Sequence, residues 1–199
     1  MNICTLYLVR HGQTQWNVDK RIQGHKDIPL NEVGEQQAHE QRELLKGISF
    51  SKVYSSDLIR AKRTAEILNL ERKLAHETTK TLRERSFGTY EGTLMEEGKK
   101  KLWDLLANYN EHPYLTESKV EVNEQVIGRS ITFLREISVA HPGQTILVVT
   151  HGGVMRQILL HLGYAIPSMA IQNLAYIKIE CDGVDFTVKR TFGITLQLP

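Results

Sequence analysis

The 199-residue chain has only two cysteines, Cys4 and Cys181, and they form no CxxC pair. A disulfide framework and a thiolate zinc site are therefore not expected, and the sparse cysteine favours a reducing, cytoplasmic location. Neither sign of charge dominates, since 25 Lys and Arg face 23 Asp and Glu. A net charge of +2 provides no general field for nucleic acid or an anionic membrane, so any anion site must come from a local cluster.

Targeting signals and long hydrophobic runs are also lacking. The first five residues have no basic region and lead directly into a strand-like segment, which argues against a signal peptide. Residues 157–177 carry no formal charge, but polar residues such as His161, Gln172 and Asn173 interrupt them, so no membrane-spanning helix is expected. Because no linker or internal repeat divides the chain, we expect one soluble domain over residues 1–199.

Apolar runs predict the strands. Residues 5–9 and 145–149 are apolar without alternation, which is typical of strands in a sheet that is covered on both faces. Weaker strand signals lie at residues 53–54, 175–179 and 186–188. The Asp182-Gly183 pair indicates a hairpin between the last two of these strands.

Helical periodicity occurs in three segments, residues 58–68, 127–137 and 153–162. Ser56 or Asp57 is the expected N-cap of the first helix. Strands that alternate with helices indicate an α/β protein, a three-layer α/β/α sandwich with a mainly parallel central sheet. A helical insertion is expected near residues 93–120.

Two histidines occupy equivalent positions at the ends of predicted strands. His11 follows the first buried strand and His151 follows the second, and each is followed by glycine. Ligands of open α/β sheets bind at the carboxyl ends of the strands. The glycines would allow the tight turn and the close backbone approach that a bound anion needs. A single histidine at a strand end is more often structural, but two in matched contexts favour a functional pair.

Metal binding is the main competing interpretation of such a pair. The chain contains no HExxH motif, and neither histidine has a ligand partner at helical or hairpin spacing. The GxGxxG and GxxxxGK[ST] motifs of dinucleotide and P-loop sites are absent as well. We therefore expect neither a metal nor an organic cofactor.

Two arginines favour a phosphate instead. Arg10 closes an otherwise apolar strand, where an unpaired guanidinium is costly to bury, and its planar fork suits a phosphate. Arg60 lies in the first turn of a predicted helix, where the helix dipole disfavours a cation unless an anion offsets it. A solvated basic face shared with Lys62 and Arg63 is the alternative interpretation of Arg60.

Four sequence blocks, in this order, resemble the signature of the histidine phosphatase superfamily, also called the phosphoglycerate mutase-like family. They are Leu8-Val9-Arg10-His11-Gly12-Gln13-Thr14 with Trp16-Asn17 and Gln23-Gly24, Ser55-Ser56-Asp57-Leu58 with Arg60-Ala61, Leu82-x-Glu84 with Phe87-Gly88 and Glu91-Gly92, and Val149-Thr150-His151-Gly152-Gly153-Val154-x-Arg156. The resemblance spans residues 5–163, whereas a bare Arg-His-Gly triplet would be unspecific.

The resemblance implies a role for each matching residue. His11 would be the nucleophile that accepts the phosphoryl group as a phosphohistidine, and Glu84 would protonate the leaving oxygen and later take a proton from water. The non-bridging phosphate oxygens would be bound by Arg10, Arg60, His151 and Asn17. Further contacts with phosphate or substrate are implied for Gln23, Gly24, Arg85 and the backbone of Gly152.

Within this family we expect a phosphatase that hydrolyses small phosphorylated metabolites. Family mutases carry extra central sequence with a paired-arginine segment followed by prolines, whereas this chain has no adjacent arginine pair. A cofactor-dependent phosphoglycerate mutase and a non-catalytic phosphate-binding module are the alternatives. The insertion near residues 93–120 would form a lid, and Lys99-Lys100-Lys101 would either bind a second anionic group or lie on a solvated helix face. Nothing in the sequence assigns an oligomeric state.

Overall fold

A six-stranded sheet forms the centre of the protein, in the order β3-β2-β4-β1-β5-β6. The computed structural model describes residues 2–98, 102, 118–167 and 170–195. Its strands are β1 (Cys4–Arg10), β2 (Lys52–Ser56), β3 (His76–Thr79), β4 (Thr145–Thr150), β5 (Ile171–Cys181) and β6 (Phe186–Ile194). The first four strands are mutually parallel, and β5 and β6 extend the sheet in antiparallel fashion. The mainly parallel sheet of the sequence analysis is therefore confirmed.

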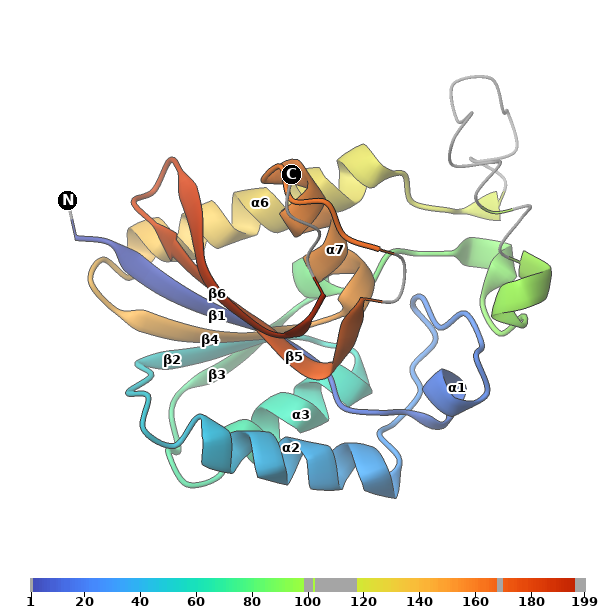
Figure 1. The fold of residues 1–199 in the computed structure, drawn as a ribbon, viewed down its shortest axis with the longest axis horizontal. Helices are drawn as coiled ribbons and strands as arrows, with labels where there is room; N and C mark the ends of the chain where they lie inside the picture. Colours follow the sequence, from blue (N-terminus) through green and yellow to red (C-terminus); the bar gives the residue numbers. More distant parts are fainter. Residues whose placement is uncertain (1, 99–101, 103–117, 168–169, 196–199) are drawn as a thin grey trace.

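Helices cover both faces of this sheet (Figure 1). One face carries α6 (Asn123–Ala140) and α7 (Gly152–His161), and the other carries α2 (Glu32–Leu44) and α3 (Ile59–Asn69). Alternate residues of β1 enter separate hydrophobic cores, since Leu6 and Leu8 pack toward α6 and α7 whereas Tyr7 and Val9 pack toward α2 and α3. This two-sided burial explains why β1 is apolar without alternation, and it confirms the three-layer sandwich.

The five predicted strands and the three helices predicted from periodicity form, but the predicted cap of α3 is wrong. The cap position is Leu58, and its side chain makes no capping hydrogen bond. The N–H of Ile59 instead donates to Asp27 Oδ1 at 2.7 Å, from a segment far away in the sequence. Asp57 is engaged elsewhere, because it forms a bidentate ion pair with Arg83. A tertiary contact has replaced the local cap that the sequence suggested.

Several smaller elements complete the chain. Three short helical pieces, α1 (Gln15–Val18), η1 (Lys80–Leu82) and η2 (Gly88–Tyr90), lie in the connections. Residues 95–98 of the predicted insertion are helical, and most of the remainder, with the three lysines, lies outside the described residues. Within the described ranges, no helix has both the length and the apolar character needed to cross a membrane.

Candidate active site

Two histidines meet at the carboxyl ends of adjacent strands. β1 and β4 are parallel neighbours, and their last residues, Arg10 and Thr150, are register partners. His11 and His151 follow directly, and the His11 N–H donates to the Thr150 carbonyl at 3.0 Å. The two ring centroids are 5.1 Å apart, with the ring planes inclined at 62°. Both side chains are buried. The fold thus brings together the two imidazoles that the sequence analysis paired.

The His11 ring is held in one orientation. Its Nδ1 lies 2.7 Å from the Gly12 carbonyl oxygen, which can only accept, so Nδ1 carries the proton. Nε2 then keeps the electron pair that a nucleophile requires. Burial, followed by the charges of Arg60 and Arg10, holds the pKa of His11 well below its usual value. Burial and the charge of Arg60 act in the same way on the pKa of His151, so both rings are neutral.

Two arginines face these rings from separate elements. Arg10, at the end of β1, donates from Nη1 to the Ile171 carbonyl. Arg60, in the first turn of α3, is fully buried and donates to the carbonyls of Lys26 and Gly24, at 2.8 Å in each case. Burial lowers the pKa of Arg60 to about 10, which leaves it charged at neutral pH. Arg60 is therefore a buried cation, and the solvated basic face considered from the sequence is wrong for it.

Polar atoms without a partner collect around the histidines. Within the described part of the chain, the buried nitrogens that lack a hydrogen-bond partner include Arg10 Nε, Arg60 Nε, Arg156 Nε and both ring nitrogens of His151. Nearly all buried N–H groups in folded proteins are satisfied, so this cluster needs an explanation. A tetrahedral oxyanion would supply several acceptors and the missing negative charge in one ligand.

Glu84 adds a carboxyl group to the same site. Its Oε1 accepts the N–H of Arg85 and its Oε2 accepts the N–H of Gly153, both at 2.9 Å. Gly153 lies in the first turn of α7, so the carboxyl group is at the helix end that favours negative charge. A side chain at Gly153 would place its Cβ 2.3 Å from Glu84 Oε1. Glycine at this position is therefore required for the carboxyl group to approach α7.

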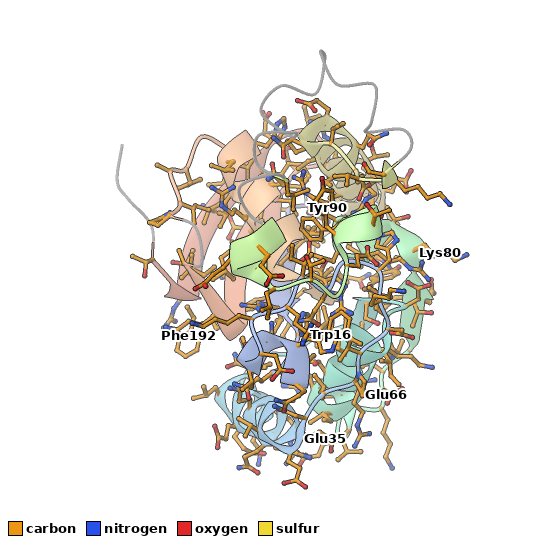
Figure 2. All side chains as sticks on the ribbon, turned by 90° about the vertical axis from the view of Figure 1, so that its right-hand side faces the viewer. Trp16, Glu35, Glu66, Lys80, Tyr90 and Phe192 are labelled. Atoms are coloured by element: carbon orange, nitrogen blue, oxygen red, sulfur yellow. The ribbon has the colours of Figure 1, made fainter. Side chains whose placement is uncertain are left out.

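The candidate site is a cavity of about 460 Å³. Its polar lining residues are Arg10, His11, Asn17, Arg21, Gln23, Gly24, Arg60, Glu84, Gly152, Gly153 and Arg156. The apolar lining residues are Ile22, Phe87, Met95, Leu102, Ala170 and Ile171. Figure 2 looks onto the end of the molecule that carries α1, with Trp16 and Tyr90 near the middle of the view. The size of the cavity and its mixture of charged and apolar walls suit a small organic anion.

Two predicted residues, Arg85 and His151, are not among the residues that line the cavity, although the His151 ring lies 5.1 Å from that of His11. The Arg85 side chain does not line the cavity, because its guanidinium donates to the Glu121 carbonyl and to Asn123. Asn17 does line the cavity, although its Oδ1 also accepts the N–H of Thr14 in a capping box. Gly12 is needed for packing, since a Cβ there would lie 2.5 Å from the carbonyl oxygen of Gly34 in α2.

Arg156 and Arg21 also line the cavity, and the sequence analysis gave neither of them a role. Arg156 belongs to α7, and the fourth sequence block contains it, so the spacing Val154-x-Arg156 is the signal that could have selected it. Its Nη2 reaches the Ile166 carbonyl only at 3.4 Å. In the described ranges of the chain, no group of three or more His, Cys, Asp or Glu side chains is placed to hold a metal ion.

Comparisons with known proteins agree with this geometry. The sequence profile of the histidine phosphatase superfamily (branch 1) matches residues 6–192. The chain is 36% identical over 183 residues to the uncharacterized phosphatase PhoE of Bacillus subtilis, covering 92% of this chain and 89% of that one. It is 36% identical over 172 residues to a metal-independent phosphoserine phosphatase of Arabidopsis thaliana, covering 82% and 70%. A phosphoglycerate mutase structure from Bacillus anthracis superposes with a TM-score of 0.83 at 28% identity, covering 97% and 94%.

Proposed function

The chain belongs to the histidine phosphatase superfamily, and we propose that it is a phosphatase that hydrolyses small phosphate monoesters through a phosphohistidine on His11. The observation that carries the proposal is the pair of facing imidazoles with two arginines beside them, whose buried Nε atoms have no hydrogen-bond partner among the described residues. Relatives named as phosphatases support the hydrolytic assignment. The domain is proposed to comprise the whole chain, since the family profile covers residues 6–192.

In the first step, His11 Nε2 attacks phosphorus in line with the ester bond. A P–N bond forms, the P–O bond breaks, and protonated Glu84 gives its proton to the leaving oxygen. Arg10 and Arg60 neutralise charge on the non-bridging oxygens, and the neutral His151 ring donates a hydrogen bond to one of them; such stabilisation is the main contribution that a protein makes to phosphoryl transfer. Among the described residues, the Nε atoms of both arginines and the ring nitrogens of His151 have no other hydrogen-bond partner.

In the second step, water attacks the phosphohistidine. Glu84, now a carboxylate, takes a proton from the water, the P–N bond breaks, and inorganic phosphate leaves with His11 neutral again. The buried cations perform the charge neutralisation for which other phosphoryl-transfer enzymes use magnesium. The proposed reaction therefore needs no metal, in keeping with the name of the Arabidopsis relative.

A phosphoglycerate mutase is the second candidate, because a protein of that name has a closely similar fold. A mutase must keep its phosphohistidine away from water long enough to return the phosphoryl group. Incubation with 3-phosphoglycerate in EDTA, followed by phosphorus NMR, separates the two activities. We expect inorganic phosphate. Formation of 2-phosphoglycerate without phosphate release would show that the protein is a mutase and not a phosphatase. If neither 3-phosphoglycerate nor p-nitrophenyl phosphate is turned over, both assignments are wrong.

Arg156 indicates the class of substrate. It is a cation on the cavity wall whose Nε has no partner in the described structure, and it is present in addition to the two arginines assigned to the phosphate. We propose that it binds a second anionic group, such as the carboxylate of a phosphorylated acid. Because hydrogen bonds to charged groups contribute about 1.5–3 kcal/mol, Arg156→Met should lower kcat/KM for 3-phosphoglycerate about 10- to 100-fold more than for glycerol phosphate. Equal losses on both substrates would remove this assignment.

A further inference from the structure

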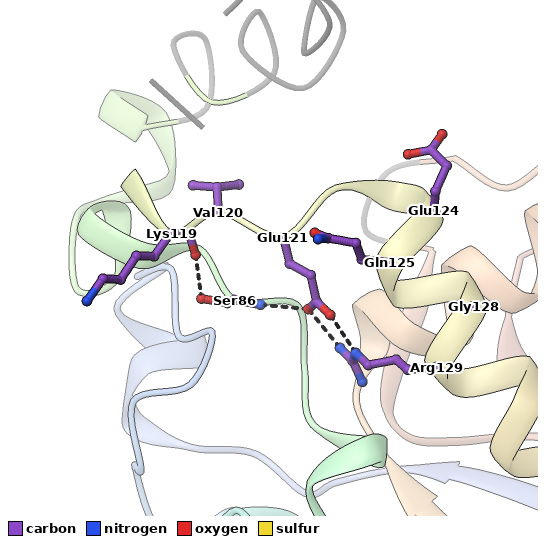
Figure 3. A pocket seen from close by; sticks show the side chains of 8 residues that line it. All are labelled: Ser86, Lys119, Val120, Glu121, Glu124, Gln125, Gly128 and Arg129. Atoms are coloured by element: carbon purple, nitrogen blue, oxygen red, sulfur yellow. Dashed lines mark hydrogen bonds and ion pairs between the residues drawn. The ribbon is translucent and has the colours of Figure 1, made fainter. Parts of the chain in front are cut away.

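An ion pair between Arg129 and Glu121 contacts the segment that contains Glu84. Arg129 of α6 donates from Nε and Nη2 to the two carboxylate oxygens of Glu121, at 2.6 and 2.9 Å. Both side chains are largely buried, with 19% and 17% exposed. Figure 3 shows this pair, together with the hydrogen bond from the Ser86 N–H to Glu121. The pair lines a separate cavity of about 680 Å³, which contains none of the catalytic side chains proposed above.

The remaining N–H groups of Arg129 reach the main chain of the Glu84 segment. Nη1 donates to the Thr81 carbonyl at 2.6 Å, and Nη2 also donates to the Glu84 carbonyl at 3.2 Å. The planar fork of one guanidinium thus joins the Glu121 carboxylate to both ends of a four-residue stretch. A lysine could not do this, because its three N–H groups originate from one nitrogen, whereas Arg129 reaches four acceptor atoms from three nitrogens.

This stretch has little regular structure of its own. It contains only the short η1, so side chains from elsewhere hold its carbonyls. The Leu82 carbonyl accepts from Thr150 Oγ1, and the Glu84 carbonyl accepts from His25 Nε2, both at 2.8 Å. Arg129 is therefore one of three side chains that fix the main chain directly before and at Glu84.

Glu121 holds the residues that follow Glu84. Its carbonyl accepts from Arg85 Nη1 at 3.0 Å, its N–H donates to the Ser86 carbonyl at 2.9 Å, and its carboxylate accepts the Ser86 N–H at 3.2 Å. The Glu84 main chain is thus bound on both sides by one ion pair. The carboxylate also pairs with the Arg129 charge, since the two side chains form an ion pair.

We propose that Arg129, oriented by Glu121, is a positioning residue that aims the Glu84 carboxyl group at the leaving oxygen. The inference rests on the proposed function, because it assumes that Glu84 transfers the proton. Glu84 Oε1 accepts the N–H of Arg85, the next residue along the chain, so a shift of this main chain moves the carboxyl group with it. Misplacement of a catalytic group by ~1 Å can cost on the order of 10²-fold in rate.

The test compares substrates with different leaving groups. An alkoxide leaving group needs a proton from the enzyme, whereas p-nitrophenolate leaves readily without one. We expect Arg129→Met to lower kcat/KM for glycerol phosphate about 10- to 100-fold and for p-nitrophenyl phosphate less than about 5-fold. Arg129→Lys should show nearly the same ratio, because it keeps the charge but loses the fork. Glu121→Gln should show the same direction with a smaller loss.

Two controls separate this inference from the proposed function. Arg135→Met removes an exposed arginine of the same helix, which donates to the Val184 carbonyl and lies over the Phe186 ring, and it should leave both rates unchanged. Glu84→Gln should reduce kcat/KM for glycerol phosphate far more than kcat/KM for p-nitrophenyl phosphate, because kcat/KM reports the first step and not the attack of water that both substrates share. If Glu84→Gln lowers both rates equally, the proposed proton donor is wrong.

If Glu84→Gln discriminates between the leaving groups and the Arg129 and Glu121 variants do not, the positioning role is refuted. A variant that lowers both rates together with the melting temperature has a general structural effect, and that result also counts against the inference. Should Arg129→Met fail to fold, Arg129→Lys and Glu121→Gln are measured on their own with the same criteria.

Discussion

The segment that contains Glu84 borders two cavities, and both are lined by arginines. The arginines of the two cavities differ in whether a carboxylate pairs with them. In the cavity beside His11, the guanidinium groups of Arg10 and Arg60 form no ion pair with any carboxylate in the described ranges, and each retains a buried Nε without a partner. In the other cavity, Arg129 has a bidentate carboxylate and two carbonyls as acceptors.

The difference teaches how a ligand site can be distinguished from a structural ion pair. A buried cation without a counter-charge raises the free energy of the folded protein, because it loses hydration and gains too little in return. Such a group is retained where a ligand supplies the charge. A cation that is already satisfied has no such need, and its effect is confined to holding the chain around it. The first cavity is therefore prepared for an anion and the second is not.

The largest expected effect concerns the group that would form the covalent bond. His11→Ala should reduce kcat by about 10⁶-fold, as is typical when a nucleophile is removed. His76→Ala provides a matched control, since His76 is a histidine outside the cavity whose pKa burial also lowers, and which contacts Ser55. Steady-state hydrolysis of p-nitrophenyl phosphate measures both. More than a few per cent of residual activity in His11→Ala would rule out the covalent mechanism.

A smaller effect is expected for Arg60, one of the two arginines proposed to bind phosphate. Arg60→Ala should lower kcat/KM about 10²- to 10³-fold, comparable to the loss of a single donor that stabilises a transition state. Arg63 is three residues further along α3, but it is half-exposed and paired with Glu35 at 2.8 Å. Arg63→Ala should change kcat/KM less than about 2-fold, since exposed ion pairs contribute little. Comparable losses of kcat/KM in the two variants would show that the ion-paired Arg63 matters as much as Arg60, and the distinction drawn between the two kinds of arginine would be wrong.

Strong periodic segments and the four sequence blocks allowed five of the six strands, three helices and most of the polar cavity lining to be predicted from the sequence. The elements that escaped prediction have weak patterns. The buried residues of α2 are Gly34, Ala38 and Gln41, which form no apolar stripe. The edge strand β3 is the four-residue polar segment His76–Thr79, which lacks a strand signature. Their formation depends on tertiary contacts that local sequence does not encode.

Long-range contacts also limited the prediction of single residues. Arg85 lies next to Glu84 in a matching block, but its side chain binds Glu121 rather than the cavity. Cys4 and Cys181 are far apart in sequence, yet they are register partners in adjacent strands, and both are free and buried. Burial raises the pKa of the Cys4 thiol to about 11, so it stays protonated at neutral pH. Sequence spacing shows neither relationship.

The two buried histidines of the candidate site should also make the stability of the protein depend on pH. Burial and the neighbouring Arg60 hold the pKa values of His11 and His151 well below the usual 6.5. In the unfolded chain both imidazoles would take up protons as the pH falls through about 6.5. Below about pH 6.5 the unfolded state therefore binds more protons than the folded state. The free energy of unfolding has its full value above this pH and decreases as the pH falls below it.

Urea unfolding between pH 7.5 and 5 measures this decrease. Well below pH 6.5, each neutral buried histidine should contribute a slope of up to about 1.4 kcal/mol per pH unit. The slope for His151→Asn should be smaller than that for the wild type by up to this amount, whatever its stability at neutral pH, because the substituted side chain does not titrate. The pKa of His76 is also lowered, but His76 is present in both proteins and its contribution cancels. Identical slopes would mean that His151 is protonated in the folded protein, and the cavity would then carry a cation that the charge balance proposed for phosphate does not include.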